Sequence, residues 1–252
     1  MGYWKMTPSL ILCLSISALF SPSSPSRVLP SSHSQKVSVG LYYESLCPYS
    51  ANFIVNYLVK LFEDDLISVV DLKLFPWGNA KLRGNNTFDC QHGPFECLLN
   101  TVEACAIDTW PDLNEHFPFI YCVEALVYEF KYREWESCFQ KLDLDPKPID
   151  KCYTSEHGKE LELKYAAETN ALQPPHKYVP WVVVDGEPLY EDYENFISYI
   201  CKAYEGTNIP KSCSQVSFDS VQMAEAKPKH SVCDKESVTP NLWELLRSTV
   251  TS

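Results

Sequence analysis

The sequence predicts an α/β fold in which a helical, cysteine-rich insertion interrupts a sheet. Two observations carry this prediction. Short segments at 37–41, 70–74 and 181–184 have the alternating or continuous apolar residues of strands. The segment at about 79–173 instead has apolar residues at helical spacing, and it contains six cysteines. With 45% hydrophobic and 13% aromatic residues among 252, the chain can bury a sizeable core, so we expect a disulfide-stabilised globular protein.

The N-terminal residues have the pattern of a secretory signal peptide. Lys5 precedes an apolar run from Leu10 to Phe20, and residues rich in proline and serine follow. The run is too short to cross a bilayer comfortably. A buried N-terminal helix is the alternative to a signal peptide. We expect 1–26 to be removed and 27–35 to be a linker or pro-segment. The mature protein is then expected to follow the secretory pathway to a lysosome or vacuole or to the outside, without a membrane anchor.

The first expected strand and helix follow directly. Apolar residues alternate with small or polar ones from Val37 to Leu41, as in a half-buried strand. From Ser50 onward, apolar residues recur at helical spacing and predict one amphipathic helix that ends near Asp64. The strand at 70–74 is parallel to the first if this helix is a crossover.

Between that strand and helix lies the stretch YYESLCPYSANF, which places Cys47 at the N-terminal end of the helix. Ser50 stands where a second cysteine would complete a C-x-x-C motif. The spacing is typical of a redox site. A serine hydroxyl, however, cannot attack a mixed disulfide as a resolving thiol does.

The predicted insertion contains at least two clear helical faces and a third, looser one around Leu161 and Tyr165. We expect its six cysteines to clamp these helices together through disulfides. The cysteines concerned are Cys90, Cys97, Cys105, Cys122, Cys138 and Cys152.

After the insertion, the stretch YVPWVVVDGEPL restores strand character. Trp181–Val184 is a short apolar run, and Asp185-Gly186 is a strong hairpin signal. A last core-facing helix is expected from Phe196 to Tyr204. We place the domain boundary at 36–213, followed by a polar tail at 214–252 that Cys233 could tie down or that is processed, with a short terminal helix near Leu245.

Cysteine parity leaves a question open. Removal of the signal peptide takes away Cys13 and leaves ten cysteines. If Cys47 is a free thiol, nine remain and cannot all pair within one chain. A second free thiol, an intermolecular bridge or a disulfide at Cys47 must resolve this.

The order of elements resembles the thioredoxin-like fold: strand, cysteine, helix, strand, insertion, proline, hairpin, helix. In that fold the proline is cis and faces the active sulfur. The resemblance implies that Val179 and Pro180 shape a substrate groove in which backbone groups meet an extended peptide. A turn-forming trans proline is the alternative.

The stretch CQHGPFECLLNTVEAC is more specific. It resembles, at every fixed position, the signature of the gamma-interferon-inducible lysosomal thiol reductase family, C-Q-H-G-x2-E-C-x2-N-x4-C. The matching residues are Cys90, Gln91, His92, Gly93, Glu96, Cys97, Asn100 and Cys105. With the proline-containing stretch at 171–189, the resemblance covers roughly 36–233.

The resemblance implies a thiol-disulfide oxidoreductase that reduces protein or peptide disulfides in an acidic, lysosome-like compartment, without a cofactor. It also implies a glycoprotein, and Asn85 begins the Asn-Asn-Thr sequon. Cys47 is then the nucleophile, with its pKa lowered at the helix N-terminus. A thiol of pKa about 8.5 is roughly one part in ten thousand ionised at pH about 4.5, so the pKa must fall far for useful reactivity there.

Ser50 departs from the family's C-x-x-C site. We expect exchange through Cys47 alone, resolved by an external thiol such as glutathione or by the substrate's own second cysteine, while Ser50 donates a hydrogen bond to the thiolate. The rival hypothesis is a weakened relative that binds thiol or unfolded partners. A further alternative makes Cys47 a structural disulfide partner.

Two other classes of function are disfavoured. The chain has 21 Lys and Arg against 33 Asp and Glu, a formal net charge of -12, which argues against nucleic-acid binding. The cysteines and His92 are suitable metal ligands by type, but cysteines of secreted proteins are more often disulfides, so we expect no metal. His92 is expected to be structural rather than a catalytic base.

Overall fold

The computed structural model describes residues 1–2, 36–63, 66–84, 87–214 and 232–235. The expected signal peptide beyond Gly2, the linker, the Asn85 sequon and the terminal helix near Leu245 all lie outside these residues. Among the described helices, none has the length and apolar content needed to cross a membrane.

The central sheet has four strands in the order β2-β1-β6-β7. Strand β1 (Val37–Tyr43) is parallel to β2 (Val70–Pro76), with Val37 opposite Val70, as the sequence predicts. Strand β6 (Trp181–Val184) lies antiparallel on the other side of β1, and β7 (Glu187–Pro188) completes the sheet. Side chains of β1 alternate between buried and more exposed positions, so one face of the strand enters the core.

The crossover between β1 and β2 is not the continuous helix that the periodicity predicts. It consists of α1 (Pro48–Phe53), the π-helical η1 (Ile54–Leu58), α2 (Lys60–Glu63) and the 3-10 segment η2 (Leu66–Val69). A π-turn adds a residue to the helical repeat, which apolar spacing alone cannot reveal.

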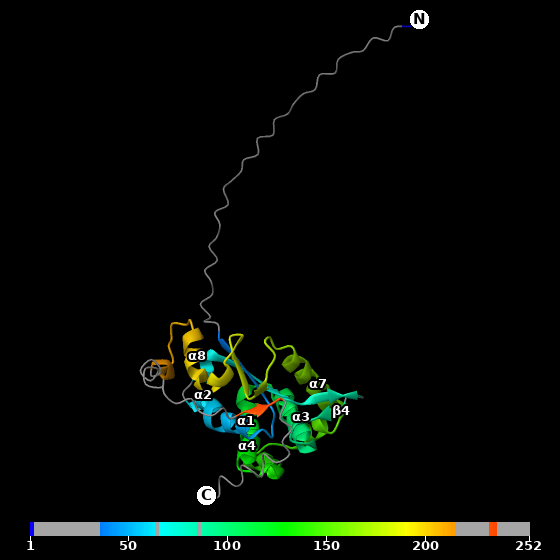
Figure 1. Cartoon of the computed structure of the whole chain (residues 1–252), viewed down its shortest axis with the longest axis vertical. Coiled ribbons are helices and arrows are strands. Elements are labelled where there is room, and N and C mark those ends of the chain that lie inside the picture. Colours follow the sequence, from blue (N-terminus) through cyan, green and yellow to red (C-terminus); the bar gives the residue numbers. More distant parts are fainter. Residues whose placement is uncertain (3–35, 64–65, 85–86, 215–231, 236–252) are drawn as a thin grey trace. The chain divides into compact units, whose positions relative to one another are not determined.

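The insertion begins with a small hairpin, β3 (Lys81–Arg83) and β4 (Thr87–Asp89), which the helical pattern does not predict. Its helices are α3 (Pro94–Thr109), α4 (Leu113–Tyr128), η4 (Tyr132–Glu134), α5 (Ser137–Lys141), α6 (Lys147–Tyr153) and α7 (Glu156–Asn170). In Figure 1, α3 lies near α7, and α4 lies near α1.

Three disulfides clamp this insertion as expected, and all six of its cysteines pair with one another. The bonds are Cys90–Cys97, Cys105–Cys152 and Cys122–Cys138. The second bond joins α3 to α6 and the third joins α4 to α5. Because these covalent bonds hold the elements of the insertion together, its stability does not depend on apolar contacts alone.

The segment after the insertion confirms the predicted cis proline and hairpin. Strand β5 (Tyr178–Val179) precedes a cis Val179-Pro180 peptide bond. Asp185 and Gly186 both have positive φ, as a tight hairpin turn requires, and they connect β6 to β7. The segments η5 (Tyr190–Asn195) and α8 (Phe196–Ala203) follow, and a disulfide joins Cys201 to Cys213.

The buried apolar residues form two main cores. One joins the sheet to the crossover and α8, with Phe53, Leu58 and Phe196 fully buried. The other joins the insertion helices around Trp77 and Phe119. A parallel β1-helix-β2 unit, an antiparallel β6-β7 hairpin and a cis proline before β6 form a thioredoxin-like core, so the predicted fold class is correct.

Candidate active site

Cys47 lies at the turn where β1 leads into α1, and its side chain is fully buried. It is the N-cap residue of α1, and Pro48 occupies the first helical turn. Proline suits that position because its missing N–H leaves no backbone donor unsatisfied there. The turn therefore holds the Cys47 sulfur at the start of the helical crossover, where backbone N–H groups favour a thiolate.

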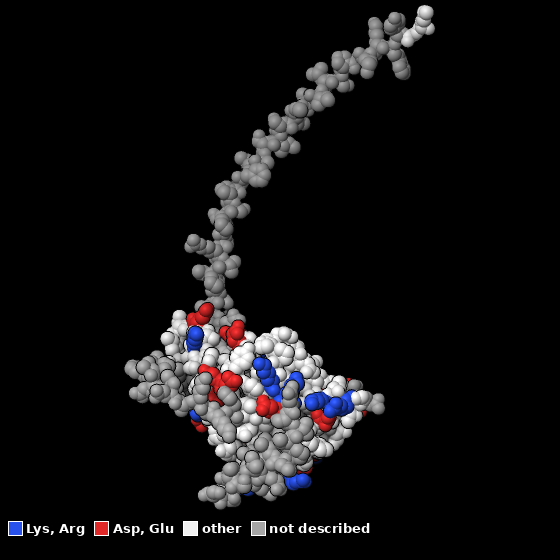
Figure 2. All heavy atoms as spheres, viewed as in Figure 1, with Lys and Arg blue, Asp and Glu red and all other residues white. Residues whose placement is uncertain are grey.

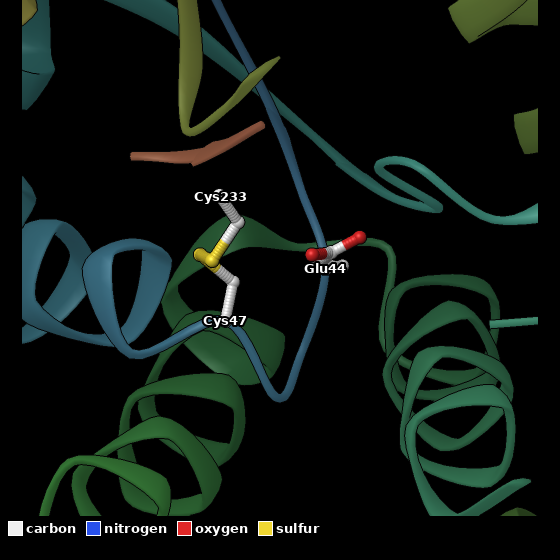
Figure 3. A group of neighbouring side chains, drawn as sticks. All are labelled: Glu44, Cys47 and Cys233. Atoms are coloured by element: carbon white, nitrogen blue, oxygen red, sulfur yellow. A yellow bond between two sulfur atoms is a disulfide. The ribbon is translucent and has the colours of Figure 1, made fainter. Parts of the chain in front are cut away.

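The Cys47 sulfur is bonded to Cys233, and Figure 3 shows the pair with Glu44 beside it. The bond joins residues 186 positions apart, with 6.2 Å between their Cα atoms. All ten cysteines after the expected signal peptide are thus paired within one chain. Of the three solutions to the cysteine parity, the structure has the disulfide at Cys47.

The cis proline brings Val179 to the active sulfur. The Cys47 Sγ lies 3.8 Å from the Val179 carbonyl oxygen, and Val179 is fully buried beside it. Strand β8 (Cys233–Asp234) pairs antiparallel with β5, with Cys233 opposite Val179 and Asp234 opposite Tyr178. The tail therefore lies as an extended strand along the edge where the sequence places the substrate groove.

Ser50 is buried on the first turn of α1, three residues after Cys47. Among the described residues, its hydroxyl oxygen has no hydrogen-bond partner. With Cys47 bonded to Cys233, the sulfur is no thiolate and offers Ser50 no strong acceptor.

Glu44 is a functional candidate that the sequence does not reveal. Its carboxylate, fully buried, lies within 4.8 Å of the sulfurs of both Cys47 and Cys233. The Asn79 backbone N–H donates to Glu44 Oε2 at 2.9 Å. Burial raises the pKa of Glu44 well above its usual range, and the nearby Glu96 raises it further, against the hydrogen bonds from Asn79. A carboxyl that keeps its proton at mildly acidic pH can donate it to a thiolate that comes within hydrogen-bond reach.

The signature residues support the segment that leads to Cys47. The Asn100 side-chain oxygen accepts a 2.9 Å hydrogen bond from the Ser45 N–H, and the Ser45 hydroxyl donates to the Glu96 carbonyl at 3.2 Å. Gly93 begins α3 with φ of 93°, a value that a side chain disfavours. Cys97 bonds to Cys90. The signature residues therefore stabilise, from the protein interior, the turn that carries Cys47.

His92 binds the Glu96 carboxylate through both its backbone N–H, at 3.2 Å to Oε1, and its Nδ1, which contacts Oε2. Nδ1 also lies 3.5 Å from Glu44 Oε1. Together with the Glu96 carboxylate, these side chains form a compact polar group whose nearest atoms lie within 4.8 Å of one another. As the sequence suggests, His92 is a hydrogen-bonding residue.

A second set of buried carboxyls lies around Tyr43 of β1. The Tyr43 hydroxyl donates to Glu103 Oε2 at 2.5 Å, and Glu124 lies close to the same group. All three side chains are fully buried. Burial raises the pKa of Glu103 to about 7 and raises that of Glu124 well above its usual range. The interior thus favours protonated carboxyls.

Charged side chains on the described surface are mixed. In Figure 2, lysines and arginines lie among acidic residues rather than in one extended basic face. Examples are Arg83, which donates to Asp89 at 2.6 Å, and Lys131, which pairs with Glu129 at 2.8 Å. This mixture agrees with the acidic composition of the chain.

Comparison with known proteins gives a consistent family. The model of the family described as "Gamma interferon inducible lysosomal thiol reductase (GILT)" matches residues 38–142. A relative from Arabidopsis thaliana named "Gamma-interferon-responsive lysosomal thiol protein" is 46% identical over 185 residues, covering 72% of this chain and 77% of the relative. "Gamma-interferon-inducible lysosomal thiol reductase" from Mus musculus is 37% identical over 195 residues, covering 75% and 76%.

Among solved structures, Chlamydia trachomatis DsbA superposes with a TM-score of 0.47 at 13% identity. The match covers 77% of this chain and 97% of that one. Pseudomonas aeruginosa DsbA gives a TM-score of 0.42 at 19% identity, with coverage of 66% and 77%.

Proposed function

Because this chain belongs to the gamma-interferon-inducible lysosomal thiol reductase family, we propose that it reduces protein or peptide disulfides with Cys47 as its single attacking nucleophile. The observation that carries the proposal is the position of Cys47, at a strand-to-helix turn, 3.8 Å from the carbonyl oxygen of Val179 and within 4.8 Å of the Glu44 carboxylate. No cofactor enters this chemistry, because thiols and disulfides exchange directly.

The cycle starts with reduction of the Cys47–Cys233 disulfide by an external thiol such as glutathione. Two thiol molecules supply two electrons and leave as one disulfide. The Cys47 thiolate then attacks one sulfur of the substrate disulfide, forms a mixed disulfide and displaces the other sulfur as a thiolate. A further external thiol attacks the Cys47 sulfur, and a last one regenerates Cys47. Each substrate disulfide thus becomes two thiols while two external thiols become one disulfide.

Two neighbours support this chemistry in an acidic compartment. The buried Ser50 hydroxyl is positioned three residues after Cys47 to donate to a thiolate and so stabilise it. Glu44, which burial keeps protonated at mildly acidic pH, donates its proton to the departing substrate sulfur, while solvent takes the proton of Cys47 and reprotonates Glu44. Both roles require the reduced state, in which the Cys47 sulfur is free.

We further propose that the protein works in a lysosome, vacuole or extracellular space as a glycoprotein modified at Asn85. Five disulfides in the described chain support an oxidising route of synthesis. The expected signal peptide supports the same route, and the names of the relatives support a lysosomal destination.

A second candidate function has one observation in its favour. Cys233 covers Cys47, and a family member with Ser50 in place of the second C-x-x-C cysteine could capture a partner once and hold it as a mixed disulfide. Such a protein is a thiol-dependent binding module rather than an enzyme. Multiple turnover with glutathione separates the two.

The test compares Cys233→Ser with the double variant Cys47→Ala/Cys233→Ser, which differs only at the nucleophile. Both are incubated with glutathione and a quenched fluorescent peptide disulfide at pH 4.5 to 7. We expect many turnovers per molecule from the first variant and a rate at least about 100-fold lower from the second, since the thiolate is the nucleophile. Equal rates contradict the proposal. A single turnover that stops as a stable adduct supports the binding module.

A further inference from the structure

The tail strand β8 occupies the groove in the manner of a bound peptide. It pairs antiparallel with β5, and the Lys235 N–H donates to the Lys177 carbonyl at 3.0 Å, which extends the pairing by one residue. Its cysteine is covalently joined to Cys47. This combination of an edge-strand pairing and a bond to the nucleophile is the geometry expected of a mixed disulfide with an extended substrate.

Two side-chain amides bind the backbone of this strand. Asn79 Nδ2 donates to the Cys233 carbonyl at 2.9 Å and to Gln91 Oε1 at 2.8 Å. Gln91 Nε2 donates to the Asp234 carbonyl at 2.7 Å. Because Asn79 binds the Gln91 oxygen, the Gln91 nitrogen is turned towards the tail, so each amide fixes the orientation of the other.

Asn79 is buried and held in place by its neighbours, so its contact with the tail is not an incidental surface contact. Asn79 is 3% exposed, and its backbone N–H is held by Glu44 at 2.9 Å. A buried donor that loses its partner is costly, so the Asn79 amide favours a groove filled by a peptide carbonyl. The hydrogen bond from the Asn79 backbone N–H to Glu44 also connects Asn79 to the carboxyl that lies near the sulfurs of Cys47 and Cys233.

We propose that Asn79 and Gln91 are the substrate-positioning residues of this enzyme, binding the carbonyls of the substrate cysteine and of the residue that follows it. The tail strand Cys233–Lys235 occupies this site as an internal substitute. The substrate class is therefore an extended polypeptide that continues past its cysteine. This inference rests on the proposed function, because it places a substrate against Cys47.

Backbone recognition also limits what the site selects. Both amides contact carbonyl groups, which every residue carries, and the Asp234 side chain is exposed. The site therefore accepts many sequences after the cysteine but requires a chain there. A cysteine at the very end of a peptide lacks the second carbonyl contact.

The experiment uses the full chain with Cys233→Ser, so that Cys47 is free and the groove is open. Three probes carry the same activated disulfide to 2-nitro-5-thiobenzoate, whose release is followed by absorbance. One is an acetylated pentapeptide amide with cysteine at its centre, one is the tripeptide amide that ends at this cysteine, and one is cysteamine. Each attack by Cys47 forms a mixed disulfide and releases one thiobenzoate anion.

The informative variant is Gln91→Glu in this background, because a carboxylate still accepts from Asn79 but cannot donate to the substrate carbonyl. We expect its second-order rate with the pentapeptide to fall at least about fivefold, the effect of one hydrogen bond. The rates with the tripeptide and cysteamine should stay within about twofold. Gln91→Met removes the donor without adding charge, and Gln140→Ala on helix α5 is a control distant in sequence from the groove.

The outcomes are distinguishable. An equal fall for all three probes, or no fall with the pentapeptide in either Gln91 variant, overturns the positioning role. If the Cys233→Ser chain itself releases no thiobenzoate from any probe, Cys47 is not nucleophilic and the proposed function fails. If that chain reacts with every probe at one common rate, the proposed function survives and only the peptide-binding site is wrong.

Discussion

The Ser45 backbone N–H donates a 2.9 Å hydrogen bond to the side-chain oxygen of Asn100, joining positions 55 residues apart. Both residues are buried. Ser45 lies between Glu44 and Cys47, so this bond fixes the short turn that carries these two residues. The signature on α3 therefore acts through the active-site turn rather than by contact with the sulfurs.

Removal of the tail cysteine is expected to release Cys47 without any reductant. In the unreduced wild type, the Cys47–Cys233 bond blocks alkylation. In Cys233→Ser, Cys47 should react with iodoacetamide directly. Mass spectrometry of the alkylated, non-reduced protein measures this, and a wild type that alkylates at Cys47 without reduction contradicts the disulfide. Cys201→Ser, which frees Cys213 rather than Cys47, is the matched control.

A second cysteine at position 50 should restore intramolecular resolution. Ser50 is buried one helical turn after Cys47, the spacing of a C-x-x-C site. Prereduced Cys233→Ser should stop as an adduct with a peptide disulfide when no external thiol is present. Prereduced Ser50→Cys/Cys233→Ser should instead release both peptide thiols, because the introduced thiol attacks the mixed disulfide. Intact mass after a single turnover distinguishes adduct from free enzyme, and an adduct in both variants contradicts the expectation.

Replacement of Glu44 by glutamine should slow turnover and alter its pH dependence. The amide keeps the size of the side chain but cannot exchange a proton with the sulfurs, and positioned acid-base groups typically contribute at least about 100-fold. We expect kcat to fall by about that factor and the pH profile between 4 and 8 to lose the ionisation of Glu44. Glu115→Gln, at an exposed position of α4, is the control. An unchanged profile contradicts the role.

Glu103 should make the fold more stable in acid than at neutral pH. Its pKa is raised from 4.5 to about 7, chiefly by burial. Below 4.5 both folded and unfolded chains hold the proton, and as pH rises towards 7 the unfolded chain loses it first. Stability contributed by this group is therefore lost across that range, on the order of 3 kcal/mol.

The measurement compares chemical unfolding of wild type and Glu103→Gln at pH 5 and 7.5. The glutamine retains an acceptor for Tyr43, so the variant should gain on the wild type at the higher pH. Comparing the stabilities of the two proteins at the same pH cancels the contributions of other titratable groups. One such group is His176, whose pKa burial lowers to about 4, so it destabilises the fold as pH falls from 6.5. A constant difference between the two proteins contradicts the prediction.

The sequence predicts the parts of this structure that local patterns encode. Alternation gives β1 and β2, positive-φ turn chemistry gives the hairpin at Asp185-Gly186, and the resemblance gives cis Pro180. The insertion's own six cysteines pair with one another as expected. The helix after Cys47 is predicted, but its π-turn is not, because one extra residue per turn leaves the apolar spacing almost unchanged.

The missing parts depend on contacts between distant segments. In the sequence, Glu44 looks like an ordinary surface acid between a strand and a turn. Only the packing of Asn79 and α3 against it reveals that it is buried. The partner of Cys47 has no local signal, since 186 positions separate the two cysteines. Asn79 and Gln91 become recognisable as peptide-binding residues only when strand β8 lies across them.

The bond between Cys47 and Cys233 also closes the described domain into a covalent ring that encloses the four other disulfides. A protease that cuts a connecting segment inside this ring nicks it without separating the pieces. The same reductant that exposes the nucleophile opens the ring, and a chain nicked beyond Cys213 then loses its tail for good. Loss of the tail therefore requires both a cut and reduction of the Cys47–Cys233 bond. A cut molecule that has lost its tail is thus one that has been reduced.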